Sequence, residues 1–371
     1  MAKQPIPESA PLLHNNQLLS SYEALIAIPS CNEFPNIRDV IYSLEINSPA
    51  LLQKTLLVIN VNNRFNSPSE NNIQTIDWLQ SYNGPLHLAY MNSTEPPYSY
   101  PEKFGVGLAR HQAVMAGLEY ISNDAPVISL DGDSPVNECY LEAIFKYSKE
   151  NGDFGAGHVN FRHRLEGTEE ENRAIQLYDE HLHRHRQGLE DAGSPHAWYA
   201  IGSTIVCTKE AYLKSGGYNP RRMAGEDFYL LQQLSKVGYK IEMIKDAFVY
   251  PSNRQSDRVP FGTGKAVTDI VESGEWKTYN STCYSVLGKF LEAVYSHLIS
   301  ESEVILRKAP SELLPWLEER KFSEVWLKLR QNNKTEVKMK QSFDSWLDAF
   351  QTLKLIHFLT ENYFPKVNIE L

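Results

Sequence analysis

Two aspartates, Asp131 and Asp133, follow an apolar run directly and are separated by one small residue, Gly132. The run Val127–Leu130 predicts a buried strand, and in an open α/β sheet ligands bind beyond the carboxyl ends of the strands. Glycine keeps such a turn open for a bulky ligand. Carboxylate oxygens suit Mg²⁺ or Mn²⁺, and either ion can bridge a diphosphate and neutralise its charge as it leaves. The sequence therefore predicts a metal site on Asp131 and Asp133.

Other interpretations of this segment stay open. The acids can form a turn that caps a helix beginning near Asn137. A calcium loop is disfavoured, because its fifth position needs an oxygen ligand and its sixth needs glycine, where this chain has Pro135 and Val136. A phosphohydrolase that uses one of the aspartates as a nucleophile needs only a carboxylate at a strand tip, and it remains an alternative.

The elements that must position these acids alternate between short apolar runs and helical patterns, which predicts an α/β fold with a mainly parallel, doubly wound sheet. The expected strands are 24–28, 55–61, 86–90, 126–130, 154–160, 201–208 and 240–244. The expected helices of this region are 36–45, 71–81, 107–121, 169–189 and 226–237. Beyond about residue 279 the chain is amphipathic helix, expected over 286–299, 312–319 and 343–359.

Three segments, in this order and spacing, resemble family 2 glycosyltransferases with the GT-A fold, the nucleotide-diphospho-sugar transferase superfamily. They are Ala24-Leu-Ile-Ala-Ile-Pro-Ser-Cys-Asn32-Glu33, Phe104-Gly-Val-Gly-Leu-Ala-Arg110 and Gly225-Glu226-Asp227, with the Asp-Gly-Asp strand between the last two. The resemblance covers about two-thirds of the chain, from Tyr22 to Val267. It implies a GT-A-like catalytic domain at 22–278, after an N-terminal tail at 1–21 and before a helical extension at 279–371.

The resemblance also implies roles for individual residues. Asp227, with Glu226 beside it, would be the catalytic base that takes the proton from an acceptor hydroxyl, and the reaction would invert the anomeric carbon. Acids in a first helical turn can also simply favour the helix dipole. Pro29, Asn32 and Glu33 would line the nucleotide pocket, with Glu33 near the ribose hydroxyls. Arg110 would lie close to the nucleotide or diphosphate, and Asp131 would contact the phosphates through the metal. A solvated surface cation is the competing interpretation of Arg110, and Gly105 and Gly107 are expected to let the backbone approach the ligand.

The chain departs from the family in two places. After the second strand it has Asn60-Val-Asn62-Asn63-Arg64 in place of an acidic turn, which leaves the identity of the donor base open. The amide of Asn60 or Asn62 could still pair with a base edge. No histidine follows the acidic pair before His297, which leaves the third metal ligand open.

Three further features could shape the site. The loop 250–265 contains glycines and is cationic, so Arg254, Arg258 and Lys265 are candidates to clamp a diphosphate as part of a lid; a solvated loop is an equal alternative. His181 and His185 stand four residues apart, which favours a polar helix face over a metal pair. Trp198 and Tyr199 could stack on a sugar or belong to the core.

Composition limits the other classes. The formal charge of −10 argues against nucleic-acid binding, and 42% hydrophobic residues allow a sizeable core. The four cysteines form no CxxC pair, and no apolar run is long enough for a transmembrane segment, so a cytoplasmic protein is expected. The resulting prediction is a hexosyltransferase-type enzyme that uses a nucleotide-sugar donor, UDP- or GDP-linked, with Mg²⁺ or Mn²⁺ and an unknown hydroxyl acceptor. A phosphohydrolase and a non-catalytic sugar-nucleotide-binding scaffold are the alternatives.

Overall fold

The computed structural model describes residues 5–63, 67–254, 262–369 and 371. The chain forms two compact units. The first comprises Met1–Glu166 and Ala200–Pro260, and the second comprises Gly167–Tyr199 and Phe261–Leu371. Among the described residues no helix is long and apolar enough to cross a membrane.

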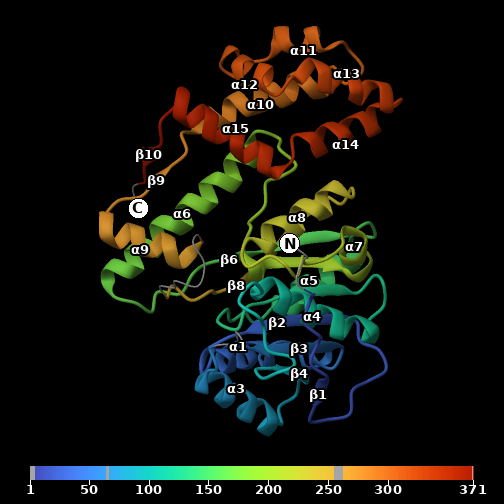
Figure 1. The fold of residues 1–371 in the computed structure, drawn as a ribbon, viewed down its shortest axis with the longest axis vertical. Coiled ribbons are helices and arrows are strands. Elements are labelled where there is room, and N and C mark those ends of the chain that lie inside the picture. Colours follow the sequence, from blue (N-terminus) through green and yellow to red (C-terminus); the bar gives the residue numbers. More distant parts are fainter. Residues whose placement is uncertain (1–4, 64–66, 255–261, 370) are drawn as a thin grey trace. The chain divides into compact units, whose positions relative to one another are not determined.

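A mixed sheet is the centre of the first unit (Figure 1), and over the described residues it has eight strands in the order β1-β4-β3-β2-β5-β7-β6-β8. The strands are β1 (Leu12–His14), β2 (Ala24–Ser30), β3 (Thr55–Asn62), β4 (His87–Ser93), β5 (Pro126–Ser129), β6 (Ala156–Phe161), β7 (Ile205–Thr208) and β8 (Ile241–Val249). Pairing is parallel for β2 with β3 and with β5, for β3 with β4 and for β6 with β8. β7 runs antiparallel between β5 and β6, and β1 runs antiparallel to β4. The predicted α/β class with a mainly parallel sheet is confirmed.

The sheet is covered by helices, which explains its apolar strands. Every residue of β2 and β3 is buried, as expected for parallel strands with both faces covered. α4 (Val106–Gly117) packs on these two strands. A methyl group at Gly117 would come within 2.4 Å of Leu25 Cδ1, so glycine allows this close approach. The other helices of the unit are α1 (Asn36–Glu45), α2 (Pro49–Leu52), α3 (Glu70–Ser81), α5 (Tyr140–Glu150), α7 (Lys209–Ser215) and α8 (Glu226–Lys236).

Some predicted elements differ at their ends. The strand expected over 201–208 begins as a 3-10 turn, Gly202–Thr204, because the backbone N–H and the hydroxyl of Thr204 both donate to the Ile201 carbonyl, over 3.0 and 2.9 Å. β8 continues to Val249, beyond the predicted end at residue 244. The exposed residues Lys245 and Asp246 interrupt its apolar pattern and hide the continuation.

The segment expected as an N-terminal tail contributes a strand to the sheet. β1 lies within the expected tail, and it pairs with β4 through Leu12–His14. The sequence places the end of the catalytic region at residue 278. In the structure α6 (Glu169–Asp191) packs with α9 (Thr263–Ser273) and α10 (Ser281–Tyr295), so these residues group with the C-terminal helices. The functional boundary remains a prediction.

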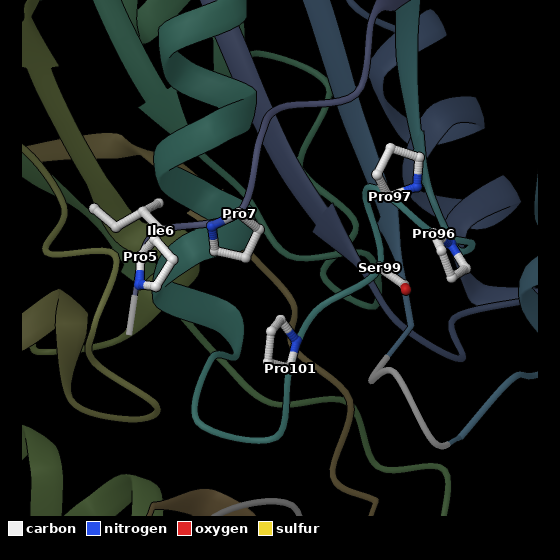
Figure 2. A pocket seen from close by; sticks show the side chains of 7 residues that line it. All are labelled: Pro5, Ile6, Pro7, Pro96, Pro97, Ser99 and Pro101. Atoms are coloured by element: carbon white, nitrogen blue, oxygen red, sulfur yellow. The ribbon is translucent and has the colours of Figure 1, made fainter. Parts of the chain in front are cut away.

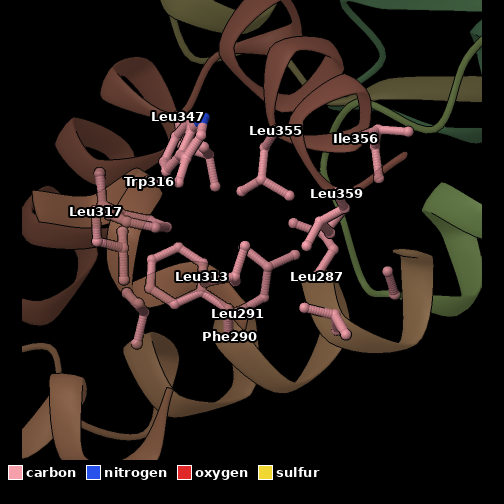
Figure 3. Close-up of a cluster of buried hydrophobic side chains, with 14 of the residues drawn as sticks. Leu287, Phe290, Leu291, Leu313, Trp316, Leu317, Leu347, Leu355, Ile356 and Leu359 are labelled. Carbon is pink, nitrogen blue, oxygen red and sulfur yellow. The ribbon is translucent and has the colours of Figure 1, made fainter. Parts of the chain in front are cut away.

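The second unit is mainly helical. After α10 it contains α11 (Ser302–Lys308), α12 (Leu314–Glu319), α13 (Phe322–Asn332), α14 (Glu336–Trp346) and α15 (Ala349–Asn362), and β9 (Lys277–Thr278) pairs with β10 (Val367–Asn368). The side chains of Leu287, Phe290, Trp316 and Leu355 are among those that form its core (Figure 3). The prediction of a single helix over 343–359 is wrong, because α14 ends at Trp346 and α15 begins at Ala349. Asp348 ends the pattern by accepting the Gln351 N–H over 2.9 Å, and it thereby caps a new helix.

Candidate active site

The candidate site lies at the carboxyl ends of β2 and β5, two neighbouring parallel strands. β2 has β3 on its other side, so the direction of the strand order reverses between β2 and β5. A reversal of this kind opens the crevice in which α/β sheets bind ligands. Pro29 is buried within the end of β2, and Asp131 and Asp133 follow β5 by a few residues. The structure therefore brings these predicted residues together.

Gly132 packs against Glu33. A methyl group on Gly132 would lie 2.8 Å from Glu33 Cγ and 3.1 Å from its Cβ, closer than ordinary contacts allow. The Ser134 N–H donates to the Asp131 carbonyl over 3.2 Å and closes the turn. The glycine thus lets the turn that carries both aspartates lie directly against Glu33, in the loop that follows β2.

The loop after β2 is held by two asparagines of α3. Asn32 has φ 60°, a left-handed conformation that asparagine adopts more readily than most residues. Its N–H donates to Asn72 Oδ1 over 2.7 Å. The Phe34 N–H donates to Asn71 Oδ1 over 2.9 Å, and the Asn71 amide donates back to the Phe34 carbonyl over 2.6 Å. These bonds set the position of Glu33, which is 6% exposed.

Arg110 of α4 is a buried cation that joins two acidic segments. Its Nη2 donates to Asp131 Oδ1, and its Nε donates to Glu226 Oε1 over 3.0 Å. The side chains of Arg110 and Glu226 are 4% and 5% exposed, so a solvated surface cation is excluded. Arg110 Nη1 is buried and has no hydrogen-bond partner among the described residues. Its guanidinium also lies 5.9 Å from the ring centre of Tyr218, whose hydroxyl bonds to Ser129 Oγ over 2.6 Å.

Gly202 makes room for this guanidinium. A methyl group at Gly202 would come within 2.0 Å of Arg110 Nη2 and 3.2 Å of Asp131 Oδ2. Sequence reasoning gave no role to Gly202, Tyr218 or Ser129. Gly202 lies within the strand predicted over 201–208, and a glycine inside a strand is a signal of close approach, but the sequence does not show what approaches it.

Asp227 and Glu226 begin α8, after Gly225 with φ 69°. Asp227 Oδ1 accepts the Phe228 N–H over 2.7 Å. Burial, together with the negative charge of Glu226, raises the pKa of Asp227 to about 7, although the Phe228 N–H and Arg110 act in the opposite direction. Among the described residues Glu226 has a cationic partner, whereas Asp227 has no salt bridge. The raised pKa of Asp227 suits it to accept a proton near neutral pH.

Arg254 reaches the site from the segment after β8. Its Nη2 donates to both carboxylate oxygens of Glu33, over 2.5 and 2.6 Å, and lies 3.1 Å from Asp133 Oδ2. The end of β8 is fixed to the segment after the two aspartates, because the Tyr250 N–H donates to the Pro135 carbonyl over 2.8 Å. Arg258 lies outside the described residues. Lys265 pairs with Asp269 on α9, in the second unit.

Other predicted residues have structural partners. Asn60 is fully buried and donates to the Tyr100 hydroxyl over 2.8 Å and to the Ala109 carbonyl over 3.2 Å, so its amide belongs to an internal network. Asn62 ends β3, and its carbonyl accepts the Asn72 amide over 2.9 Å. Its contact with a nucleotide base stays a prediction. A methyl group at Gly107 would meet the Arg222 carbonyl at 2.4 Å, which makes this glycine a packing position.

The histidines and aromatic residues singled out from the sequence belong to the second unit. His181 Nδ1 bonds to Thr278 Oγ1 over 2.9 Å, and His185 Nδ1 bonds to the Tyr284 hydroxyl over 2.8 Å. Trp198 and Tyr199 are 6% and 5% exposed, which supports the core interpretation for both.

The acids of the site fit a divalent cation in part. No group of three or more His, Cys, Asp or Glu side chains that could hold a metal ion occurs in the described part of the chain. Mg²⁺ needs fewer protein ligands, since it is commonly bound by one or two carboxylates, with water and substrate phosphates completing the shell. Burial raises the pKa of Asp131, and the nearby charge of Asp133 adds to this while Arg110 opposes it. A cation between the two aspartates would relieve their mutual repulsion, so the donor set suits an ion that arrives with phosphates.

An apolar pocket of about 320 Å³ lies elsewhere in the first unit (Figure 2). It is lined by Pro5, Ile6, Pro7, Pro96, Pro97, Ser99 and Pro101. None of the predicted site residues lines it, and it offers no charged group to a phosphate.

No protein-family model and no curated protein matches the chain. The chain resembles sugar-nucleotide-binding proteins of known structure. One is residues 1–349 of TarS from S. aureus in complex with UDP-GlcNAc, with a TM-score of 0.44 and 14% identity over 79% of this chain and 78% of that chain. A second is the mannosyltransferase PcManGT from Pyrobaculum calidifontis in complex with GDP-Man and Mn²⁺, with a TM-score of 0.44 and 13% identity over 91% and 85% of the two chains.

A third is glucosyl-3-phosphoglycerate synthase from Mycobacterium tuberculosis with Mn²⁺, UDP-Glc and phosphoglyceric acid, with a TM-score of 0.39 and 16% identity over 68% and 79% of the two chains. All three TM-scores are below 0.5, so the proposed function rests on the residues of this chain.

Proposed function

We propose that the chain is a metal-dependent glycosyltransferase that moves a sugar from a nucleoside diphosphate sugar to an acceptor hydroxyl. The observation that carries the proposal is the junction of two acidic segments at Arg110. On one side Asp131 and Asp133 form a carboxylate pair suited to a cation and a diphosphate. On the other side Glu226 is ion-paired and Asp227 has a pKa raised to about 7.

Each group has a separate task in such a transfer. Asp227 accepts the proton of the acceptor hydroxyl while that oxygen attacks the anomeric carbon and the bond to the diphosphate breaks. One displacement of this kind inverts the configuration. Asp131 and Asp133 would hold Mg²⁺ or Mn²⁺, which supplies charge neutralisation for the leaving diphosphate. Glu226 positions Arg110, and Arg110 in turn holds Asp131.

The nucleotide would lie beside the loop after β2. Glu33 can accept hydrogen bonds from two ribose hydroxyls. Asn32 follows β2 by two residues, and Asn62 is the last residue of the neighbouring strand β3. We propose that the donor sugar is linked to UDP or GDP. Arg254 is within reach of the same carboxylates and can bind phosphate oxygens through two parallel N–H bonds.

The test is a thermal-shift panel of UDP-, GDP-, dTDP- and CDP-linked sugars, each with and without Mn²⁺. A ligand that binds only the folded state raises the melting temperature, so one nucleotide class should give a shift that a chelator abolishes. Asp133→Ala should lose this shift. Asp153→Ala is the matched control, because Asp153 is an exposed acid of the same unit.

The absence of any shift in the wild-type protein would contradict the proposal. Release of inorganic phosphate from a phosphomonoester, with a covalent phosphate on Asp131, would establish the phosphohydrolase alternative. Binding of the nucleotide sugar without transfer to any hydroxyl acceptor, water included, would favour the scaffold.

A further inference from the structure

We infer that Arg254 acts as an internal counter-ion of the site, so that a divalent cation binds tightly only together with a diphosphate. The inference rests on the proposed function, and it adds an order of binding to it. It concerns how the two aspartates are neutralised before the donor arrives.

Arg254 connects acids that come from two neighbouring strands. Its Nη2 contacts both oxygens of Glu33, which follows β2, and lies 3.1 Å from Oδ2 of Asp133, which follows β5. Glu33 is 7% and Asp133 19% exposed at the side chain, so water screens this cluster only partly. A positive group is needed there, because two carboxylates held this close in a poorly solvated place repel each other.

The two arginines of the site differ in their freedom to move. Arg110 is 4% exposed, and the backbone at Gly202 lies close against its guanidinium. Arg254 is 30% exposed, and within the described part of the chain its guanidinium pairs with the carboxylates of Glu33 and Asp133. Each aspartate of the pair therefore has its own arginine, and only the partner of Asp133 is placed so that it can withdraw.

A divalent cation on Asp131 and Asp133 would compete with Arg254 for Asp133 Oδ2. Two positive groups cannot share that oxygen without strong repulsion. A diphosphate changes the balance, since it offers new anionic oxygens to the cation and to the guanidinium, which binds phosphate in a bidentate manner. Cation and diphosphate should then strengthen each other's binding, and the coupling is reciprocal.

The experiment measures Mn²⁺ binding directly, by the EPR signal of the free ion, without nucleotide and with saturating UDP or GDP. For the wild-type protein we expect Mn²⁺ to bind about tenfold or more tightly when the nucleotide is present. Arg254→Gln should bind Mn²⁺ alone several-fold more tightly than the wild type, and the strengthening by nucleotide should shrink. Arg254→Lys keeps the charge and should keep Mn²⁺ binding weak in the absence of nucleotide.

Arg162→Gln is the control, because Arg162 is an exposed arginine of the same unit and its loss changes the net charge equally. A melting curve for each variant checks folding. If Arg254→Gln binds Mn²⁺ alone no more tightly than the wild type does, Arg254 is not a counter-ion and the inference fails, while nucleotide binding can still support the proposed function. If the wild type binds neither Mn²⁺ nor any nucleotide, the proposed function fails and the inference fails with it.

Discussion

Arg110 Nε donates to Glu226 Oε1 over 3.0 Å, and both side chains are at most 5% exposed. This ion pair joins α4 to α8, and through Nη2 the same guanidinium also holds Asp131 after β5. One buried cation thereby sets the distance between the proposed metal acids and the proposed base. Its removal should affect stability and binding together.

Arg110→Met is expected to destabilise the first unit by about 3–5 kcal/mol, because it leaves Glu226 and Asp131 without their counter-charge. Urea unfolding at pH 7 measures the change. Lys54→Met is the comparison, since Lys54 forms an exposed pair with Glu23 over 2.8 Å, and such pairs contribute about 1 kcal/mol or less. Equal stability of the two variants would show that the buried pair has no structural role.

Asp227→Asn is expected to retain donor binding and to lower the turnover number by about 10²–10⁴-fold, because the amide cannot accept the proton of the acceptor hydroxyl. Steady-state kinetics give the turnover number, and calorimetry gives the dissociation constant of the donor. Asp153→Asn should leave both unchanged. A variant at Asp227 with wild-type turnover would assign the base to another residue.

Gly202→Ala tests the space around the guanidinium. The added methyl group would meet Arg110 Nη2 at 2.0 Å, so Arg110 must shift and the variant should lose about 1–3 kcal/mol of stability. Metal-dependent nucleotide binding should weaken with it. Gly152→Ala serves as the control, because nothing lies within 4 Å of a methyl group there. If the two alanine variants have the same stability and the same nucleotide binding, the close approach of Gly202 to Arg110 contributes to neither.

The stability of the second unit should depend on pH through His181 and His185. Burial lowers the pKa of His181 from 6.5 to about 4 and that of His185 from 6.5 to about 3, with neighbouring positive charge adding to the effect in each case. Between pH 6.5 and about 4 both rings stay neutral in the folded unit, whereas in the unfolded chain they take up protons. Stability should therefore be complete above about pH 6.5 and fall towards pH 4, by about 1 kcal/mol per pH unit for each histidine.

Denaturant unfolding between pH 7.5 and 4.5 measures this slope. His185→Gln should flatten the pH dependence, while His14→Gln, at an exposed position of the first unit, should not. If the free energy of unfolding of His185→Gln depends on pH as steeply as that of the wild type, other groups take up the protons on unfolding.

The sequence by itself determined the α/β class, because apolar runs of strand length alternate with helical periodicity, and these are local properties. It also placed Asp131 and Asp133 directly after a strand, since the end of a strand follows from where the apolar run stops. The break at Asp348 was missed because the apolar period continues across it while the cap interrupts the helix. The end of β8 was missed because exposed charges lie in the middle of the strand.

Only the tertiary structure decided which charged groups meet. Arg110 and Glu226 are 116 residues apart, and Arg254 and Glu33 are 221 residues apart. Nothing local in the sequence distinguishes an arginine that is buried against two acids from one that faces water. Pairing of this kind depends on strand order, on helix packing and on small residues such as Gly202 that leave room for a guanidinium. The acids of the site could therefore be read from the chain, whereas their neutralisation by two arginines of unequal freedom is a property of the folded protein.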